Sequence, residues 1–197
     1  IDDSNKYTGD KLTVVRVDVA TGQRTVVVPQ NGILPAASKS GQLVWVNYDP
    51  TTSNFQMMVG GADGSNPKAI LSQKDFQSVL WPVVSPDGKT IAFSGSGRTN
   101  STVATLGSSI GALLNPLLPS IAEAHGLPWD PWTIGTDGAA LKKLVSIGSD
   151  EQAMAWSPDG TEIAMANLSS TFLMRADGSG FNRIFTHGDP GGLSWKT

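Results

Sequence analysis

The chain contains the sequence Trp81-Pro-Val-Val-Ser-Pro-Asp-Gly-Lys-Thr-Ile-Ala-Phe93, and a near-copy follows as Ala155-Trp-Ser-Pro-Asp-Gly-Thr-Glu-Ile-Ala-Met165. Both copies hold Ser-Pro-Asp-Gly, then a variable pair, then Ile-Ala and a large apolar residue. A short apolar run stands on each side of the Ser-Pro-Asp-Gly core, which predicts a tight β-hairpin that occurs twice.

The four central residues of each copy are expected to form the turn itself. Proline sets φ near the value that a type I turn needs at its second position. Aspartate bonds the backbone two residues further on, and glycine takes the left-handed conformation that closes the turn. The predicted structural turns are Ser85, Pro86, Asp87 and Gly88 in the first copy and Ser157, Pro158, Asp159 and Gly160 in the second.

A second repeated unit places a two-residue turn between apolar runs. It occurs at Asp63-Gly64, Asp137-Gly138 and Asp177-Gly178, and in the same form at Thr21-Gly22. Gly22 and Gly64 are 42 residues apart and Gly138 and Gly178 are 40 apart, whereas Gly64 and Gly138 are 74 apart. A base period of roughly 40 residues is that of four-stranded propeller blades, and the long interval indicates about 30 inserted residues. Ser38-Lys-Ser-Gly41 is interpreted as a degenerate copy of the Ser-Pro-Asp-Gly turn.

Two kinds of turn at this period resemble the blades of TolB-like, WD-repeat-like propellers. The resemblance is strongest over residues 79–94 and 153–184, and it covers most of the chain outside residues 97–130. It implies an all-β fold, a β-propeller of four-stranded antiparallel blades of which about four are seen. It also implies a place outside the cytoplasm, in the periplasm, in the cell envelope or secreted. It leaves the task of the protein open, because a fold does not determine a function.

Residues 1–197 are expected to form a single, partial propeller domain. Residues 11–28 supply the outer two strands of one blade, and the C-terminal residues 191–197 echo residues 153–157 and start another. Three full blades lie between. The two ends could share one blade of a four-bladed ring, but its second strand would then be missing. We therefore favour part of a larger ring, and the first residues, Ile1-Asp-Asp-Ser4, suggest a mature or trimmed N-terminus.

Four tryptophans are expected on equivalent inner or second strands: Trp45, Trp81, Trp156 and Trp195. Packing between blades is the favoured role, with Trp81 and Trp156 at matching places in neighbouring sheets. A ring of aromatic side chains lining one propeller face is the alternative.

Residues 97–130 are predicted to be an insertion in the third full blade, between its second and third strands. Apolar residues recur there at helical spacings, so one or two short helices are expected. A blade already has its own core, so this apolar face either folds back over the propeller or docks a partner chain or membrane surface. The candidate partner-binding residues are Leu113, Leu114, Leu117, Leu118, Ile121, Trp129 and Trp132.

No catalytic, cofactor-binding or metal-binding residue is predicted. The chain has no cysteine and two histidines, which excludes thiol chemistry and a histidine-rich metal site. Gly107-Ser-Ser109-Ile-Gly111 fits the nucleophile elbow of α/β-hydrolases, with His125 or His187 as base. That elbow needs a parallel sheet around it, which a short insertion cannot supply.

The favoured function is a non-catalytic extracytoplasmic scaffold that mediates protein–protein interaction within a larger assembly. A small-ligand or glycan-binding propeller, or the propeller portion of a larger hydrolase, is the alternative. The partner is expected to be another protein chain, bound through residues 97–130 or a propeller face. Net charge is −3, which provides no basic surface for nucleic acid, and no transmembrane helix is predicted.

Overall fold

A computed structural model describes residues 12–98, 128–188 and 193–195, and this part of the chain contains β-strands and no helix. The all-β prediction is therefore confirmed, whereas the helices predicted within residues 97–130 fall almost entirely outside the described residues. The strands are β1 (Val14–Val17), β2 (Arg24–Val28), β3 (Gly32–Ala37), β4 (Leu43–Asp49), β5 (Asn54–Gly60), β6 (Lys68–Ser72), β7 (Ser78–Val84), β8 (Thr90–Ser96), β9 (Trp129–Gly135), β10 (Lys142–Lys143), β11 (Ala153–Trp156), β12 (Glu162–Ala166), β13 (Thr171–Arg175) and β14 (Asn182–Phe185).

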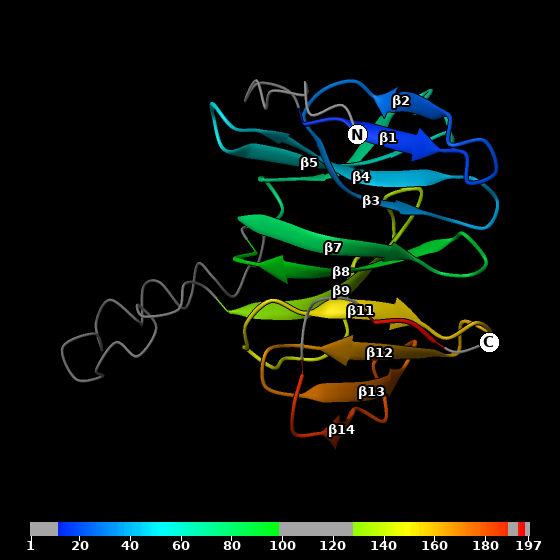
Figure 1. Cartoon of the computed structure of the whole chain (residues 1–197). Coiled ribbons are helices and arrows are strands. Elements are labelled where there is room, and N and C mark those ends of the chain that lie inside the picture. The colour runs from blue at the N-terminus through cyan, green and yellow to red at the C-terminus, as the bar shows by residue number, and fades with distance from the viewer. Residues whose placement is uncertain (1–11, 99–127, 189–192, 196–197) are drawn as a thin grey trace.

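The strands form three four-stranded antiparallel sheets and one two-stranded pair. In each sheet the strands neighbour one another in chain order, β3 to β6, β7 to β10 and β11 to β14, while β1 pairs with β2. Figure 1 shows these four layers stacked one above another in sequence order. The innermost strands β3, β7 and β11 face each other across the two interfaces between full sheets. This is the arrangement of successive propeller blades, with the predicted pair of outer strands at the N-terminal end.

The Ser-Pro-Asp-Gly turns have the geometry expected from their residues. The Ser85 hydroxyl donates to Asp87 Oδ1 at 2.6 Å and accepts the Thr90 N–H at 2.9 Å, and Gly88 has a φ of 74°. The turn at residues 157–160 repeats the same bonds, at 2.6 Å to Asp159 and 2.9 Å from Glu162. Each serine thus fixes its own aspartate and also receives the first N–H of the next strand.

The degenerate turn at residues 38–41 has the same pattern of hydrogen bonds, with a serine hydroxyl in place of the aspartate carboxylate. The Ser38 hydroxyl accepts the Gln42 N–H at 3.0 Å, as Ser85 does for Thr90. It forms a 2.8 Å bond to the Ser40 hydroxyl, which takes the place of the aspartate. The interpretation of residues 38–41 as a copy of the repeated turn is confirmed by these contacts.

The Asp-Gly turns join each sheet to the one before it. Lys68 Nζ donates to the carbonyl oxygen of Asp137 at 2.8 Å, and Lys142 Nζ donates to that of Asp177 at the same distance. The two lysines lie on the fourth strands β6 and β10, and each holds the turn of the following sheet. This lysine clamp between neighbouring sheets was not predicted from the sequence, although both lysines lie four residues after the glycine of their own sheet's Asp-Gly turn.

Apolar side chains fill both interfaces between full sheets. Phe76 lies edge-on to Phe93 and Trp132 in the interface between β3–β6 and β7–β10, with ring centroids 5.5 and 5.0 Å apart. The next interface is built mainly from methionines of β11–β14, which pack with Ala92 of β8. Burial of these side chains is the main stabilising contribution to the stack, because a single sheet cannot hide its apolar faces.

The expected match between Trp81 and Trp156 is wrong in detail. Both lie on innermost strands, β7 and β11, but Trp81 sits in a β-bulge between Leu80 and Val83, has a φ of 53° and is 38% exposed. Trp156 pairs with Ile163, and its counterpart in the preceding sheet is Val84, which pairs with Ile91. Trp156 and Val84 directly precede the serines of their turns, whereas Trp81 lies four residues before Ser85, so the two tryptophans are out of register.

The position of the insertion also differs from the prediction. Residues 99–127 fall between β8 and β9, which belong to the second of the three full sheets rather than the third. Trp129 and Asp130, predicted to end the insertion, are the first residues of β9. The prediction numbered this sheet one too high; it is the third group of strands only if the two-stranded pair β1–β2 is counted as the first.

Candidate functional site

The hairpin β1–β2 exposes an apolar face. At its base Val14 pairs with Val28, and both are buried against Leu43 and Trp45 of β4. Beyond a β-bulge the pairing passes to Val15 and Val26, which are exposed. Neighbouring residues of a strand point to opposite faces, so Val15 and Val26 lie on the face of the hairpin opposite to that of Val14 and Val28.

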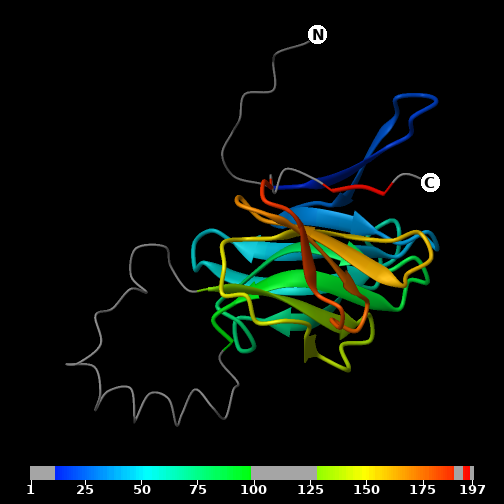
Figure 2. The same cartoon turned by 90° about the horizontal axis from the view of Figure 1, so that it is seen from below.

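Three valines form this exposed face, which we call the hairpin patch: Val15, Val17 and Val26, with 40%, 50% and 55% of their surface exposed. Val15 is directly opposite Val26, and Val17 is two residues along the same strand, so the three share one side of the hairpin. Figure 2 shows the hairpin projecting from the body of the molecule. Projecting apolar residues of this kind are typical of contact surfaces.

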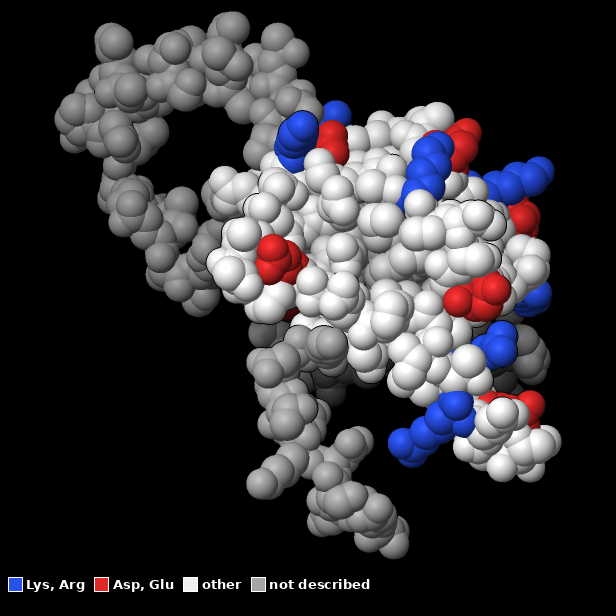
Figure 3. Space-filling model, turned by 90° about the horizontal axis from the view of Figure 1, so that it is seen from above, with Lys and Arg blue, Asp and Glu red and all other residues white. Residues whose placement is uncertain are grey.

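The middle of the face at this end of the stack carries few charges, whereas the hairpin itself bears Arg16, Asp18 and Arg24. Figure 3 views the end of the stack at which β1–β2 lies, and its wide central area is free of Lys, Arg, Asp and Glu, which gather toward the margin. Depletion of charge at the centre with charge around the rim is the pattern of protein interfaces.

A central hollow of about 350 Å³ lies where the innermost strands reach their turns. Trp156 Nε1 donates to the Val83 carbonyl at 3.2 Å, and Trp195 Nε1 donates to the Ala155 carbonyl at 3.0 Å. Val83 and Ala155 each lie two residues before the serine of their turn. Trp156 and Trp195 therefore occupy equivalent places one sheet apart, and both line this hollow.

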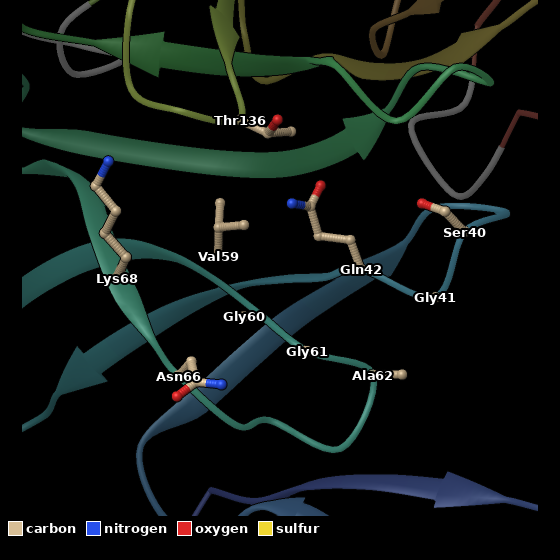
Figure 4. A pocket seen from close by; sticks show the side chains of 10 residues that line it. All are labelled: Ser40, Gly41, Gln42, Val59, Gly60, Gly61, Ala62, Asn66, Lys68 and Thr136. Atoms are coloured by element: carbon tan, nitrogen blue, oxygen red, sulfur yellow. The ribbon is translucent and has the colours of Figure 1, made fainter.

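A second hollow, about 580 Å³ in volume, lies between the turns of the first two full sheets. Figure 4 shows Gln42, Asn66 and Lys68 around it, with Gly60 and Gly61 along the chain below. The Oε1 atom of Gln42 is buried there without a hydrogen-bond partner. Lys68 also lines this hollow, but its ammonium group is already bound to the Asp137 carbonyl.

A third hollow, of about 330 Å³, opens at the other end of the first full sheet. We call it the amide hollow, because most of its lining side chains are carboxamides. The residues that line it are Asn31, Asn47, Asp49, Asn54, Phe55, Gln56 and Gln73. Sequence reasoning missed it, since its residues are spread over β4, β5 and the segments that precede β3 and follow β6.

Most residues predicted to bind a partner lie outside the described residues: Leu113, Leu114, Leu117, Leu118 and Ile121. Trp129 is half-buried at the start of β9. Trp132 is 5% exposed and packs within the sheet interface, with the Arg98 guanidinium 4.9 Å from its ring centre. Trp132 is therefore a core residue that offers no surface to a partner, because its ring faces the neighbouring sheet instead of solvent.

Ser109 and His125 also lie outside the described residues, and His187 is exposed beside Thr186. Among the described residues, no group of three His, Cys, Asp or Glu side chains could hold a metal ion. Within the same residues, no helix is long and apolar enough to cross a membrane.

The stacked meander sheets and their repeated turns define a β-propeller fold, and solved structures match it. TolB from Acinetobacter baumannii superposes with a TM-score of 0.61 at 14% identity, over 87% of this chain and 37% of that one. A chain of a nidogen/laminin complex gives 0.62 at 10% identity, over 89% and 58%. The β-propeller domain of the Trilobed protease from Pyrococcus furiosus gives 0.54 at 11% identity, over 89% and 48%.

The likeness to TolB and to other propellers is thus one of fold, at low identity. This chain spans between 37% and 58% of the length of these three structures. No protein-family model matches the sequence, and comparison with curated protein sequences finds no match.

Proposed function

We propose that the protein is a non-catalytic scaffold that binds another protein through the hairpin patch, outside the cytoplasm. The hairpin patch carries the proposal: three valines share one face of a projecting hairpin and are 40–55% exposed. Arg24 is directly opposite Val17 on this face, so a partner that covers the valines must also pair with or leave solvated one guanidinium group.

The rest of the described chain suits a rigid support. Its full sheets are joined by buried apolar interfaces and by lysine clamps between turns. The base of the hairpin packs separately on Leu43 and Trp45 of β4, which fixes the hairpin on this support. A partner that binds a preorganised surface pays less conformational entropy than one that must order it.

Site-specific photo-crosslinking in intact cells tests the proposal. A crosslinking amino acid placed at Val17 should yield one defined partner, in a product that fractionates with the cell envelope or the medium. The same amino acid at Arg183, an exposed residue of β14 at the opposite end of the stack, is the matched control.

The partner identified in this way is then purified and its affinity measured. The double variant Val17→Ser/Val26→Ser should bind it about tenfold or more weakly, because two partly exposed valines each lose on the order of 1 kcal/mol of burial. Its unfolding midpoint should stay close to that of the parent, since neither valine belongs to the core. Equal affinity of the double variant, or equal crosslinking at Val17 and Arg183, would count against the proposal.

A further inference from the structure

The amide hollow is built from two cross-strand pairs on one face of the first full sheet. Asn47 of β4 is directly opposite Gln56 of β5, and Asp49 is opposite Asn54. Residues two apart on a strand share a face, so these four side chains form a two-by-two array with cross-strand Cβ atoms about 5 Å apart.

Asn31 and Gln73 extend this array at its sides. Asn31 has a φ of 59°, and its carbonyl accepts the Tyr48 N–H at 2.7 Å, which holds it beside the end of β4. Gln73 follows Ser72, the residue paired with Gln56. Strands β4 and β5 and the residues that flank β3 and β6 therefore place carboxamides around one hollow.

The carboxamides in the hollow are half-buried or exposed and bond to no other group of the described chain. Among the described residues, the side chains of Asn31, Asn47, Asn54, Gln56 and Gln73 form no hydrogen bond, although each offers one carbonyl acceptor and an NH₂ donor. The face they occupy is continuous with Leu43 and Trp45, which β1–β2 covers, yet no residue of β1 or β2 lines the hollow.

Asp49 supplies a fixed negative charge at the edge. Its carboxylate accepts the Thr52 hydroxyl and the Thr51 N–H, both at 2.8 Å. These bonds, the Thr52 hydroxyl first, hold the pKa of Asp49 below its usual value, so the group stays ionised as a hydrogen-bond acceptor.

The lining selects the chemistry of a ligand. No lysine or arginine lines the hollow, which disfavours phosphate and other anions, and a single carboxylate does not make a calcium site. Its one aromatic residue, Phe55, is buried in the sheet core, so an apolar side chain gains little contact. Adjacent carboxamides that both donate and accept match neighbouring hydroxyl groups, which do the same.

We propose that the amide hollow binds a neutral saccharide of one or two sugar units. Its volume of about 330 Å³ is at the small end of the roughly 300–1,000 Å³ typical of small-molecule sites. The carboxamides of Asn47 and Gln56, central in the array, pair with vicinal hydroxyls of the sugar, and the Asp49 carboxylate accepts a further hydroxyl. This site is separate from the hairpin patch and does not depend on the proposed scaffold function.

Saturation-transfer NMR on the whole chain tests the site. The probes are glucose, galactose, mannose, N-acetylglucosamine, maltose and cellobiose, with galacturonate, inorganic phosphate and calcium chloride as charged comparisons. At least one neutral sugar should show saturable transfer, and a longer oligomer of that sugar, if it binds more tightly, identifies a polysaccharide as the source. Absence of binding by all the neutral sugars, or binding of calcium or phosphate that displaces the sugar, would overturn the proposal.

Variants locate the binding. Asn47→Ala/Gln56→Ala should weaken the sugar about thirtyfold through the loss of two hydrogen bonds. Gln42→Ala, which removes a carboxamide from the hollow in Figure 4, is the matched control and should bind as the parent does. Thermal unfolding confirms that both variants are folded. Unchanged affinity in a folded Asn47→Ala/Gln56→Ala variant would also overturn the proposal.

Discussion

At the scale of single residues, Gly178 shows how closely the turns approach neighbouring sheets. It has a φ of 85°, and a Cβ atom placed there would lie 2.5 Å from the backbone oxygen of Leu144. Gly22 has a similar φ of 72° in an equivalent turn, but no atom lies within 4 Å of its Cβ position. The two glycines therefore share a backbone conformation, but only Gly178 lies against the preceding sheet.

We predict that Gly178→Ala lowers the free energy of unfolding by about 3 kcal/mol and Gly22→Ala by about 1 kcal/mol, measured by urea denaturation. Backbone strain at positive φ costs roughly 1–3 kcal/mol, and only Gly178 adds a clash that pushes its turn away from Leu144. The displaced turn also weakens the bond from Lys142 to Asp177. Equal losses in the two variants would mean that the turn does not bear on the preceding sheet.

At the scale of elements, Gln152 connects the second full sheet to the third. Its side chain is 0% exposed; Oε1 accepts the Ser94 hydroxyl at 2.8 Å, and Nε2 donates to the Trp129 carbonyl at 3.0 Å and the Ser149 hydroxyl at 2.9 Å. Ser94 lies on β8 and Trp129 on β9, whereas Gln152 directly precedes β11. One carboxamide thus satisfies buried groups of both sheets.

We predict that Gln152→Leu costs about 3 kcal/mol of stability, because it leaves several buried polar groups without partners. Gln56→Leu, at an exposed carboxamide without hydrogen bonds, should stay within about 0.5 kcal/mol of the parent. Chemical denaturation of both variants measures the difference. A Gln152→Leu variant as stable as Gln56→Leu would show that the two sheets are held by their apolar contacts alone.

The strands and turns were largely predictable, because the proline, aspartate and glycine of each turn favour its backbone conformation. Ser-Pro-Asp-Gly and Asp-Gly at a regular period predicted the order of strands in all three full sheets. The mismatch between Trp81 and Trp156 was predictable, since Trp81 lies four residues before Ser85 and Trp156 directly precedes Ser157. The partial exposure of Trp81 was not predictable, because its β-bulge leaves no mark in the spacing of the motifs. The hairpin patch depends on which face of β1–β2 packs on β4, and the amide hollow depends on the register between β4 and β5. Both features arise between elements, where a one-dimensional pattern carries little information.

At the scale of the whole molecule, exposed aspartates in turns and loops tie stability to pH. Hydrogen bonds from neighbouring hydroxyl and N–H groups lower the pKa of six of them: Asp18, Asp49, Asp63, Asp87, Asp159 and Asp177. For Asp159 the Ser157 hydroxyl, then the Thr161 N–H and hydroxyl, lower the pKa to about 2 from 3.8. A carboxyl group whose pKa is lower in the folded state stabilises that state above the unfolded value, and this contribution disappears as pH falls through the folded value.

We therefore predict that the melting temperature is nearly constant above about pH 5 and falls between about pH 4 and about pH 2, the interval set by the two pKa values of Asp159. Asp87→Asn/Asp159→Asn should make this fall shallower, because two groups that bind protons more readily in the unfolded chain no longer titrate. Asp150→Asn, at an exposed carboxylate that accepts no hydrogen bond from the described residues, is the control and should retain the parent slope. Differential scanning calorimetry across this interval measures the slopes. The same slope in the double variant and the parent would mean that the turn aspartates do not link protonation to folding, and that acid sensitivity arises elsewhere in the chain.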